Sequence, residues 1–522
     1  MTHDTTHTIF RSAKHFFSGT VLSRLTGLLR DILMAYAFGT GVSVAAFFVA
    51  FRFANLFRRL LGEGALQTAF IPYFEKLRNE DAQKAGQFFY NLTTLLSLVL
   101  MGITVLVVSG IALFLHYGDP SEDNREILLL TAIIQPGLLF ICLYGLNSSF
   151  LQCEKNYLIP SAAPVAMNGI WILGILSLWN FSAEQAMPWL SVFILAACFG
   201  QWAFTIPHTR ALLKGFHLKN PWKSVQLFST DIKKMLVPLF LGMTGVAAEQ
   251  INSAIDPVFA YYANPEGPAL LWFAIRLQQL PLALFGIAIA GALLPPISRA
   301  IKTQDFPTYY RFLDFGLQRT VALMIPITGA LFMIGESYIA LLYGHGDFTS
   351  QSIIGTTHCL WGYSLGLLPM TLILVIAPAF YAQNKYSLTT QASLISILTN
   401  IALNTFFVVM LDLGAASVAL ATSLSAWVNM TQLAVALHRQ LHVNLSSSLL
   451  VNTLKVLTAT SIACLAVMAL GYYPLAGAFS RSIVDSCGFV AALAAAAWML
   501  KADDLLYIWK SSTPERGSMT PV

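Results

Sequence analysis

Arginine is the residue type in this chain with the clearest chemical potential, because five arginines lie inside its first two long apolar stretches. They are Arg24, Arg30, Arg52, Arg58 and Arg59. A guanidinium at mid-bilayer depth costs about 2.5–3.5 kcal/mol on insertion scales, so it is retained where an anion or water faces it. The planar guanidinium also matches phosphate and carboxylate better than lysine does. The arginines therefore predict a site for an anionic ligand, best suited to a phosphate or pyrophosphate.

The acids beside these arginines are too few to neutralise them all, since the two stretches hold only Asp31 and Glu63. Successive side chains on a helix are turned by about 100°, so we expect Arg30 and Asp31 to point in different directions. Arg59 stands four residues before Glu63, and we expect it to pair along the helix or to snorkel. Three arginines are predicted to contact the ligand, namely Arg24, Arg30 and Arg58. The alternative is that arginine–acid pairs only hold helices together.

A second copy of the pattern surrounds Arg276. The sequence FRFANL around Arg52 is followed by Pro72, and the sequence IRLQQL around Arg276 is followed by Pro295. The spacing from arginine to proline differs between the copies by a single position. We therefore predict two lobes of six helices, related by the interval from Arg52 to Arg276. Many secondary transporters place a substrate site between duplicated lobes at the middle of the membrane.

The composition defines the elements that must hold these arginines. Of the 522 residues, 56% are hydrophobic and 11% charged, against about 25% charged in an ordinary soluble domain. Apolar stretches of about 20 residues recur along the chain, as transmembrane helices require, and the short alternating segments of a β-barrel are missing. We predict an all-α polytopic membrane protein of about fourteen spans. They are expected to begin near residues 15, 42, 90, 127, 160, 187, 235, 269, 320, 352, 386, 414, 451 and 484.

The charges of the loops predict the orientation. With the N-terminus in the cytoplasm, the outward loops carry only Arg125 and Arg481 as arginine or lysine, and nearly all other loop lysines and arginines face inward. This bias predicts that both termini are cytoplasmic and that the number of spans is even. We predict a first lobe over residues 1–225, including a linker between the lobes, a second lobe over 226–445, and a final helix pair with a cytoplasmic tail over 446–522.

A second polar set lies in later spans. Carboxylate, amide and hydroxyl oxygens are ligands for a small hard cation such as Na⁺, and they are supplied here by Glu249, Gln250, Asn252, Asp256, Asn400, Asn404, Thr422 and Ser423. Asn400 and Asn404 are four residues apart and share a helix face. The alternative is that these side chains only form hydrogen bonds between helices.

Enzymatic motifs are missing from the sequence. It contains no HExxH, no GxSxG, no P-loop and no dinucleotide fingerprint, and its histidines stand mostly at the terminus or in loops. The net charge of +5 is spread over loops and spans rather than gathered in a basic domain, so it does not indicate nucleic acid. We predict a transporter that uses no cofactor, driven by Na⁺ or by the membrane potential.

Four segments resemble one known family. They are SRLTGLLRDILMAYAFGTG (23–41), AFFVAFRFANLFRRLLGEGALQTAFIP (46–72), FAIRLQQLPLALFGIAIAGALLPPIS (273–298) and APAFYAQ (377–383). They are similar, in order and along nearly the whole chain, to the MurJ (MviN) lipid II flippases of the exporter superfamily that includes the MATE transporters. The resemblance implies fourteen helices in two MATE-like six-helix lobes around an alternating-access cavity, and a final helix pair that holds a polyprenyl tail.

The resemblance also implies roles for single residues. The cavity arginines of the family match Arg24, Arg30, Arg58 and Arg276. Ser23 matches a residue of the same substrate site, whereas Asp31, Arg59 and Glu63 match residues that pair helices or close a gate between the lobes. The sodium site known in some members matches Asp256, Asn400, Asn404 and Thr422. Two positions depart from the family pattern: Ala45 replaces an acid found in many members, and Asn404 replaces a carboxylate of that sodium site.

The implied function is transport of lipid II from the cytoplasmic to the outer leaflet of the bacterial inner membrane. Alternatives are a flippase for another polyprenyl-pyrophosphate-linked oligosaccharide and a MATE-type small-molecule antiporter, although an antiporter for cations would favour acidic rather than basic cavity residues. A membrane-embedded glycosyltransferase or a scaffold without transport activity is a further alternative. Lipid II and membrane lipids are the expected partners, together with cell-wall synthases or scaffold proteins.

Overall fold

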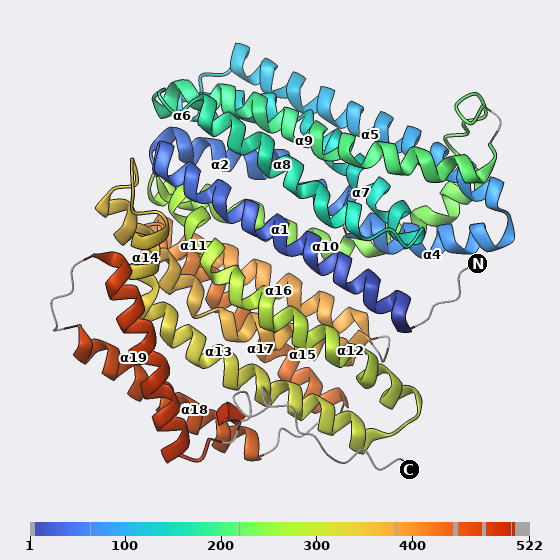
Figure 1. The fold of residues 1–522 in the computed structure, drawn as a ribbon. Coiled ribbons are helices and arrows are strands. Elements are labelled where there is room, and N and C mark those ends of the chain that lie inside the picture. The colour runs from blue at the N-terminus through green and yellow to red at the C-terminus, as the bar shows by residue number, and fades with distance from the viewer. Residues whose placement is uncertain are drawn as a thin grey trace. The chain divides into compact units, whose positions relative to one another are not determined.

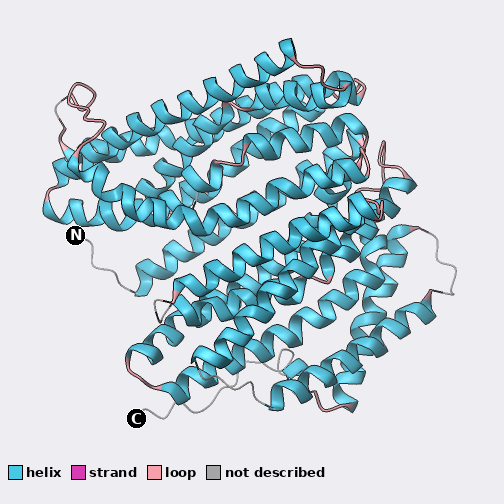
Figure 2. Ribbon diagram, turned by 180° about the vertical axis from the view of Figure 1, so that it is seen from behind, coloured by secondary structure: helices cyan, strands magenta, loops and turns pink. Residues whose placement is uncertain are grey.

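The computed structural model consists of helices joined by short connections (Figures 1 and 2). It describes residues 6–62, 64–218, 220–381, 383, 385–441, 447–471, 477–502 and 504–506. Within these ranges no strand occurs, which confirms the predicted all-α class. Ten helices of the described chain are long and apolar enough to cross a membrane, or eleven if one bent pair counts as a single span. The count of fourteen spans stays a prediction.

The chain divides into two compact units. The first runs to Val258 and includes Gly346–Phe348, and the second comprises Phe259–His345 and the chain from Thr349 onward. Gly346–Phe348 join the first unit because the Asp347 N–H donates a hydrogen bond of 3.0 Å to the Tyr36 carbonyl. The change of unit thus falls at Val258, well after the lobe boundary of 225/226 expected from the sequence.

The helices of the first unit are listed here in chain order. They are α1 (Thr6–Phe38), α2 (Val42–Ala54), α3 (Arg58–Leu61), α4 (Ala65–Glu80), α5 (Ala82–Tyr117), α6 (Glu122–Ile134), α7 (Gly137–Cys153), α8 (Leu158–Ser177), α9 (Ala183–Leu213) and the 3-10 turn η1 (Lys214–Phe216), followed by α10 (Thr230–Ala263), which reaches into the second unit.

The second unit continues with helices of similar length. They are α11 (Gly267–Pro281), the π-helical turn η2 (Leu282–Gly286), α12 (Ile287–Lys302), α13 (Phe306–Leu342), α14 (Ser350–Ser364), α15 (Leu367–Tyr381), α16 (Tyr386–Asn404), the π-helical turn η3 (Thr405–Met410), α17 (Ala416–Leu441), α18 (Ser447–Leu470) and α19 (Ala478–Met499).

The order of helices repeats along the chain. Four helices of the first unit, α2, α5, α6 and α8, have counterparts in α11, α13, α14 and α16. The paired helices begin at nearly the same interval from each other as Arg52 and Arg276, namely at Val42 and Gly267, Ala82 and Phe306, Glu122 and Ser350, and Leu158 and Tyr386. The duplication read from the sequence is therefore confirmed.

Each copy also interrupts its helices at matching places. The α2–α3–α4 segment is broken between Asn55 and Gly64, where the second copy has η2. The joint between α6 and α7 is bent by 43°, and it matches the joint between α14 and α15. The two copies thus share their breaks as well as their order of helices.

The break after α2 is the main departure from the expected spans, because the sequence predicted one continuous helix there. Asn55 ends α2 by donating from its side-chain amide to the Phe51 carbonyl at 2.8 Å. Gly64 then has a φ of +143°, which only glycine adopts without strain. Interrupted helices at membrane depth are tolerated where they are buried in protein or line a cavity, and corresponding breaks in two halves point to a binding site.

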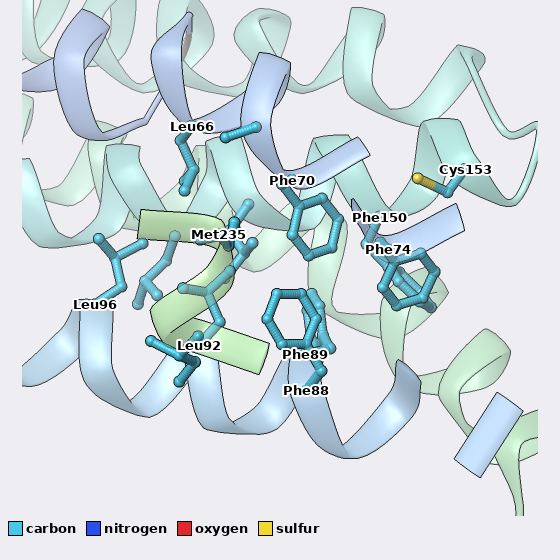
Figure 3. Close-up of a cluster of buried hydrophobic side chains, with 14 of the residues drawn as sticks. Leu66, Phe70, Phe74, Phe88, Phe89, Leu92, Leu96, Phe150, Cys153 and Met235 are labelled. Carbon is cyan, nitrogen blue, oxygen red and sulfur yellow. The ribbon is translucent and has the colours of Figure 1, made fainter. Parts of the chain in front are cut away.

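An aromatic cluster forms the core near α4, α5 and α7 (Figure 3). Phe70 and Phe74 of α4 stack at 5.1 Å between ring centroids, and Phe150 of α7 meets Phe89 of α5 at 4.9 Å. Met235 of α10 is buried in the same cluster. This packing explains why the early part of α10 belongs to the first compact unit rather than to the second.

The final helix pair packs on α13 of the second unit. Val456 of α18 and Ala496 of α19 are buried with Val321 of α13 in one apolar cluster. The chain beyond α19 returns to the same helix, where Arg319 Nη1 donates to the Asp504 carbonyl at 2.8 Å. The pair is therefore attached to α13 both by this apolar cluster and by the hydrogen bond of Arg319.

Candidate functional site

Arg30 of α1 is held within the protein. Its side chain is buried, and its Nε and Nη2 donate to Asp31 Oδ1 at 3.0 and 2.7 Å. Nη1 donates to Asn168 Oδ1 of α8 at 3.0 Å. The expectation that Arg30 and Asp31 point in different directions is therefore wrong. The long arginine side chain reaches around the helix to its neighbour, and the low dielectric around it favours the ion pair over separate charges.

Asn168 and Trp171 complete this cluster, and sequence analysis missed both. Asn168 Nδ2 donates to the Ser23 carbonyl at 3.1 Å and to Thr26 Oγ1 at 3.0 Å. Arg30 Cζ stands 4.3 Å from the centroid of the buried Trp171 ring, within range of a cation–π interaction. A signal was present in the sequence, because Asn168 is a lone amide in an apolar helix, but its partner on α1 is distant in the chain.

Arg24 differs from Arg30 although both lie on α1. Its side chain is exposed, and none of the described residues forms a hydrogen bond or an ion pair with its guanidinium. Ser23 is half-buried and contributes its backbone carbonyl to Asn168. Arg24 is thus a cation inside an apolar helix whose charge the described protein does not neutralise.

The arginines of the second segment lie on either side of the helix break. Arg52, near the end of α2, donates from Nη1 to the Ser253 carbonyl of α10 at 3.1 Å. Arg58 is half-buried and forms the first residue of α3, the short helix inside the break. The side chain of Arg59, and Glu63 altogether, lie outside the described residues, so their predicted pairing is not tested.

Arg276 occupies the matching place in the second unit. It lies half-buried on α11, shortly before η2 begins. Its Cζ stands 4.2 Å above the ring of Trp272, one turn earlier on the same helix. Stacking on an indole uses the face of a guanidinium, whereas two-pronged phosphate binding uses the N–H groups at its edge, so the two interactions are compatible.

Three residues of the predicted cation site come together in the second unit. Asn404 Nδ2 donates to Asn400 Oδ1 at 2.9 Å, and Asn400 Nδ2 donates to Thr422 Oγ1 at 3.3 Å. Thr422 Oγ1 donates in turn to the Val418 carbonyl at 3.1 Å. Asp256 is buried but belongs to the other compact unit.

This network shows the hydrogen bonds that the alternative predicts, and the sodium site stays a prediction. The amide oxygen of Asn400 and the hydroxyl oxygen of Thr422 each accept a protein hydrogen bond. Each oxygen has two lone pairs, so these hydrogen bonds do not by themselves exclude a cation. The three side chains link α16 to α17, as intramembrane amides commonly do.

The fold and the site together define a class of protein. Apolar helices in a repeated order, matched interruptions in both copies, and guanidinium groups beside those interruptions are the features of a multi-pass membrane transporter for an anionic substrate. Similar proteins show which family of this class the chain belongs to.

The family model described as "Lipid II flippase MurJ" matches residues 34–481, and the chain belongs to this family. It is 32% identical to "Probable lipid II flippase MurJ" of Chlamydia muridarum, over 82% of this chain and 78% of that protein. It is 29% identical to the Chlamydia pneumoniae protein of the same name, over 95% of this chain and 93% of that protein.

Solved structures share the fold. The structure titled "Lipid II flippase MurJ, inward closed conformation" superposes with a TM-score of 0.79 at 22% identity, covering 94% of this chain and 99% of that one. An inward-facing multidrug MATE transporter of the MOP superfamily superposes with a TM-score of 0.62 at 13% identity, covering 82% and 95%. The predicted MATE-like architecture is thereby confirmed.

Proposed function

We propose that this chain moves lipid II, the undecaprenyl-pyrophosphate-linked precursor of peptidoglycan, from the cytoplasmic to the outer leaflet of the bacterial inner membrane. Family membership over residues 34–481 carries this proposal. The cationic side chains beside the helix breaks support it, because a pyrophosphate is the anionic group that such a lipid presents. The chain acts by transport rather than catalysis, through alternating access.

Arg24, Arg58 and Arg276 are the proposed contacts to the pyrophosphate. Arg24 is exposed on α1, whereas Arg58 and Arg276 lie half-buried at the two matched interruptions. Charge-assisted hydrogen bonds from guanidinium to phosphate are shorter and roughly twice as strong as neutral ones. Arg30 has a different role in this proposal, because Asp31 and Asn168 already bind it. It holds α1 against α8 and thereby places Ser23 and Arg24.

The membrane potential is the proposed driving force. Moving one elementary charge through a potential of 100 mV changes the free energy by about 2.3 kcal/mol. The membrane potential therefore favours the conformational change by which an empty cavity lined with arginines returns to face the cytoplasm. Sodium coupling through Asp256, Asn400, Asn404 and Thr422 is the alternative. The hydrogen bonds among the last three join α16 to α17, a role that needs no cation.

The membrane topology, the lobes and the site for the lipid tail are proposed from the loop charges and the family. Both termini face the cytoplasm, the lobes comprise residues 1–225 and 226–445, and the pair α18 and α19 within 446–522 binds the polyprenyl tail. Cell-wall synthases or scaffold proteins are proposed partners on the same grounds.

The function is tested by replacing Arg24, Arg58 and Arg276 singly with alanine. Each variant is assayed for growth of cells depleted of their own flippase and for lipid II translocation in proteoliposomes. We expect each to lose most of the activity of the parent chain, while Arg125→Ala, an exposed arginine outside the predicted site, retains it. Full activity of all three variants would refute the assignment.

Native mass spectrometry of the purified chain separates the rival substrates. Bound lipid II supports the proposal, and a different polyprenyl-linked oligosaccharide supports the second candidate. Conversion of added lipid II into glycan would instead indicate a glycosyltransferase.

A further inference from the structure

The helix break of the first unit rests directly on α7. Gly62 ends α3, and its N–H donates to the Arg58 carbonyl at 2.8 Å. A Cβ placed on Gly145 of α7 would lie 2.1 Å from the Gly62 carbonyl oxygen, 2.6 Å from its carbon and 3.0 Å from its Cα. All three are backbone atoms, so no flexible side chain can turn away. Glycine is the residue that admits this approach at position 145.

Gly62 meets α7 on two successive turns. A Cβ on Gly62 would lie 3.0 Å from Cys142 Cα and 3.3 Å from Cys142 Sγ, and Gly145 follows one turn later. Gly62, Cys142 and Gly145 are all buried. The end of α3 therefore sits against small residues of α7, as closely packed helices in membranes do. This contact fixes the position of α3 relative to α7.

A related contact occurs in the second unit. Gly286 ends η2, and the interval from Gly62 to Gly286 equals that from Arg52 to Arg276. A Cβ on Gly286 would lie 3.0 Å from Thr371 Cγ2 and 3.4 Å from Thr371 Oγ1. Thr371 belongs to α15, which follows the α14/α15 joint as α7 follows the α6/α7 joint. Each interruption therefore ends in a glycine packed against the second half of the jointed segment.

We propose that Gly145 is a positioning residue for Arg58. Arg58 begins the single turn that Gly62 closes, so a shift of Gly62 moves the arginine with it. Alanine at position 145 must push the Gly62 oxygen from 2.1 Å to beyond 3.0 Å, below which real Cβ contacts essentially never occur. Binding groups have to be held within about 0.5 Å of their productive geometry. The inference rests on the proposed function, in which Arg58 binds the anionic headgroup of lipid II.

A double-mutant cycle tests the inference. The affinity for lipid II is measured in nanodiscs for the parent chain, Gly145→Ala, Arg58→Ala and the variant carrying both changes. We expect each single change to weaken binding about ten-fold, the loss of one charge-assisted hydrogen bond. The double variant should bind no more weakly than Arg58→Ala, because Gly145 acts through that arginine. The control is Gly110→Ala on α5, where a Cβ would meet nothing within 4 Å, and its affinity should be unchanged.

Three results would overturn the inference: unchanged affinity in Gly145→Ala, unchanged affinity in Arg58→Ala, or losses that multiply in the double variant. If Gly145→Ala does not fold, Gly62→Ala replaces it in the same cycle. A Cβ there would lie 2.8 Å from the Arg58 carbonyl oxygen and 3.0 Å from Cys142 Cα, so it displaces the same turn from both sides. Absence of lipid II binding by the parent chain would instead refute the proposed function. A parent chain that binds, with Gly145→Ala unaffected, defeats only the positioning role.

Discussion

Asp31→Ala is expected to destabilise the first compact unit strongly. The change removes the carboxylate that accepts hydrogen bonds of 3.0 and 2.7 Å from Arg30, in a pair whose side chains are only 10% and 6% exposed. Removing one partner of a buried ion pair costs about 3–5 kcal/mol, because the other charge stays buried. With about 2 °C of melting temperature per kcal/mol in a unit of this size, we expect a fall of roughly 6–10 °C.

The assay is thermal unfolding of the purified chain in nanodiscs, followed by intrinsic fluorescence. Arg24→Ala is the matched control, since Arg24 is an exposed arginine of the same helix that the described residues do not bind. Its free energy of unfolding should change by no more than about 0.5 kcal/mol. An unchanged melting temperature in Asp31→Ala, or an equal fall in both variants, would show that Arg30 is not held as the structure indicates.

Three further outcomes are expected. Arg30→Lys should lower stability and transport more than Arg24→Lys does. The reason is that an ammonium cannot bind Asp31 and Asn168 together while it also stacks on the Trp171 ring. Equal losses for the two variants in transport and melting assays would contradict this. Replacing Na⁺ by choline should leave translocation in proteoliposomes unchanged, whereas a strict Na⁺ requirement would favour the sodium alternative. Hydrogen bonds from the Thr308 side chain and N–H hold the pKa of the Asp305 carboxyl, at the start of α13, below its usual value. The stabilisation from this cap should therefore be fully present above the unfolded pKa of about 3.9 and should be lost as the pH falls through the lowered folded pKa. Melting curves recorded over this pH range should show a weaker pH dependence for Asp305→Asn than for the parent chain.

The sequence was sufficient to predict features that follow from composition and period. Long apolar runs predicted helices, and the matching surroundings of Arg52 and Arg276 predicted a duplication that the helix starts confirm. The helices follow from averages over many residues, in which the identity of a single side chain matters little. The duplication and the segments that match the MurJ pattern follow instead from particular residues at fixed spacing, which can be read directly from the sequence.

Features that depend on single contacts were not predictable. The break between Asn55 and Gly64 lies inside the second predicted span, and hydropathy does not distinguish a broken helix from a continuous one. Two glycines close together, Gly62 and Gly64, were the available signal, but glycine is also frequent in intact membrane helices. The hydrogen bond from Arg30 to Asn168 joins residues that are distant in the chain, and no local pattern connects the two.

Arg30 and Arg24 lie on the same helix but in different environments. The cost of burying Arg30 is offset inside the protein by Asp31, Asn168 and Trp171, which also tie α1 to α8. Arg24 lies about 9 Å from Arg30 along the helix axis, and no described residue offsets its charge. Because the helix is already held in place, binding of an anion has to order only the Arg24 side chain and not the backbone that carries it, so more of the interaction contributes to affinity. In the proposed function, we therefore expect Arg24 to discriminate between a pyrophosphate and a neutral headgroup, and Arg30 to determine where Arg24 lies.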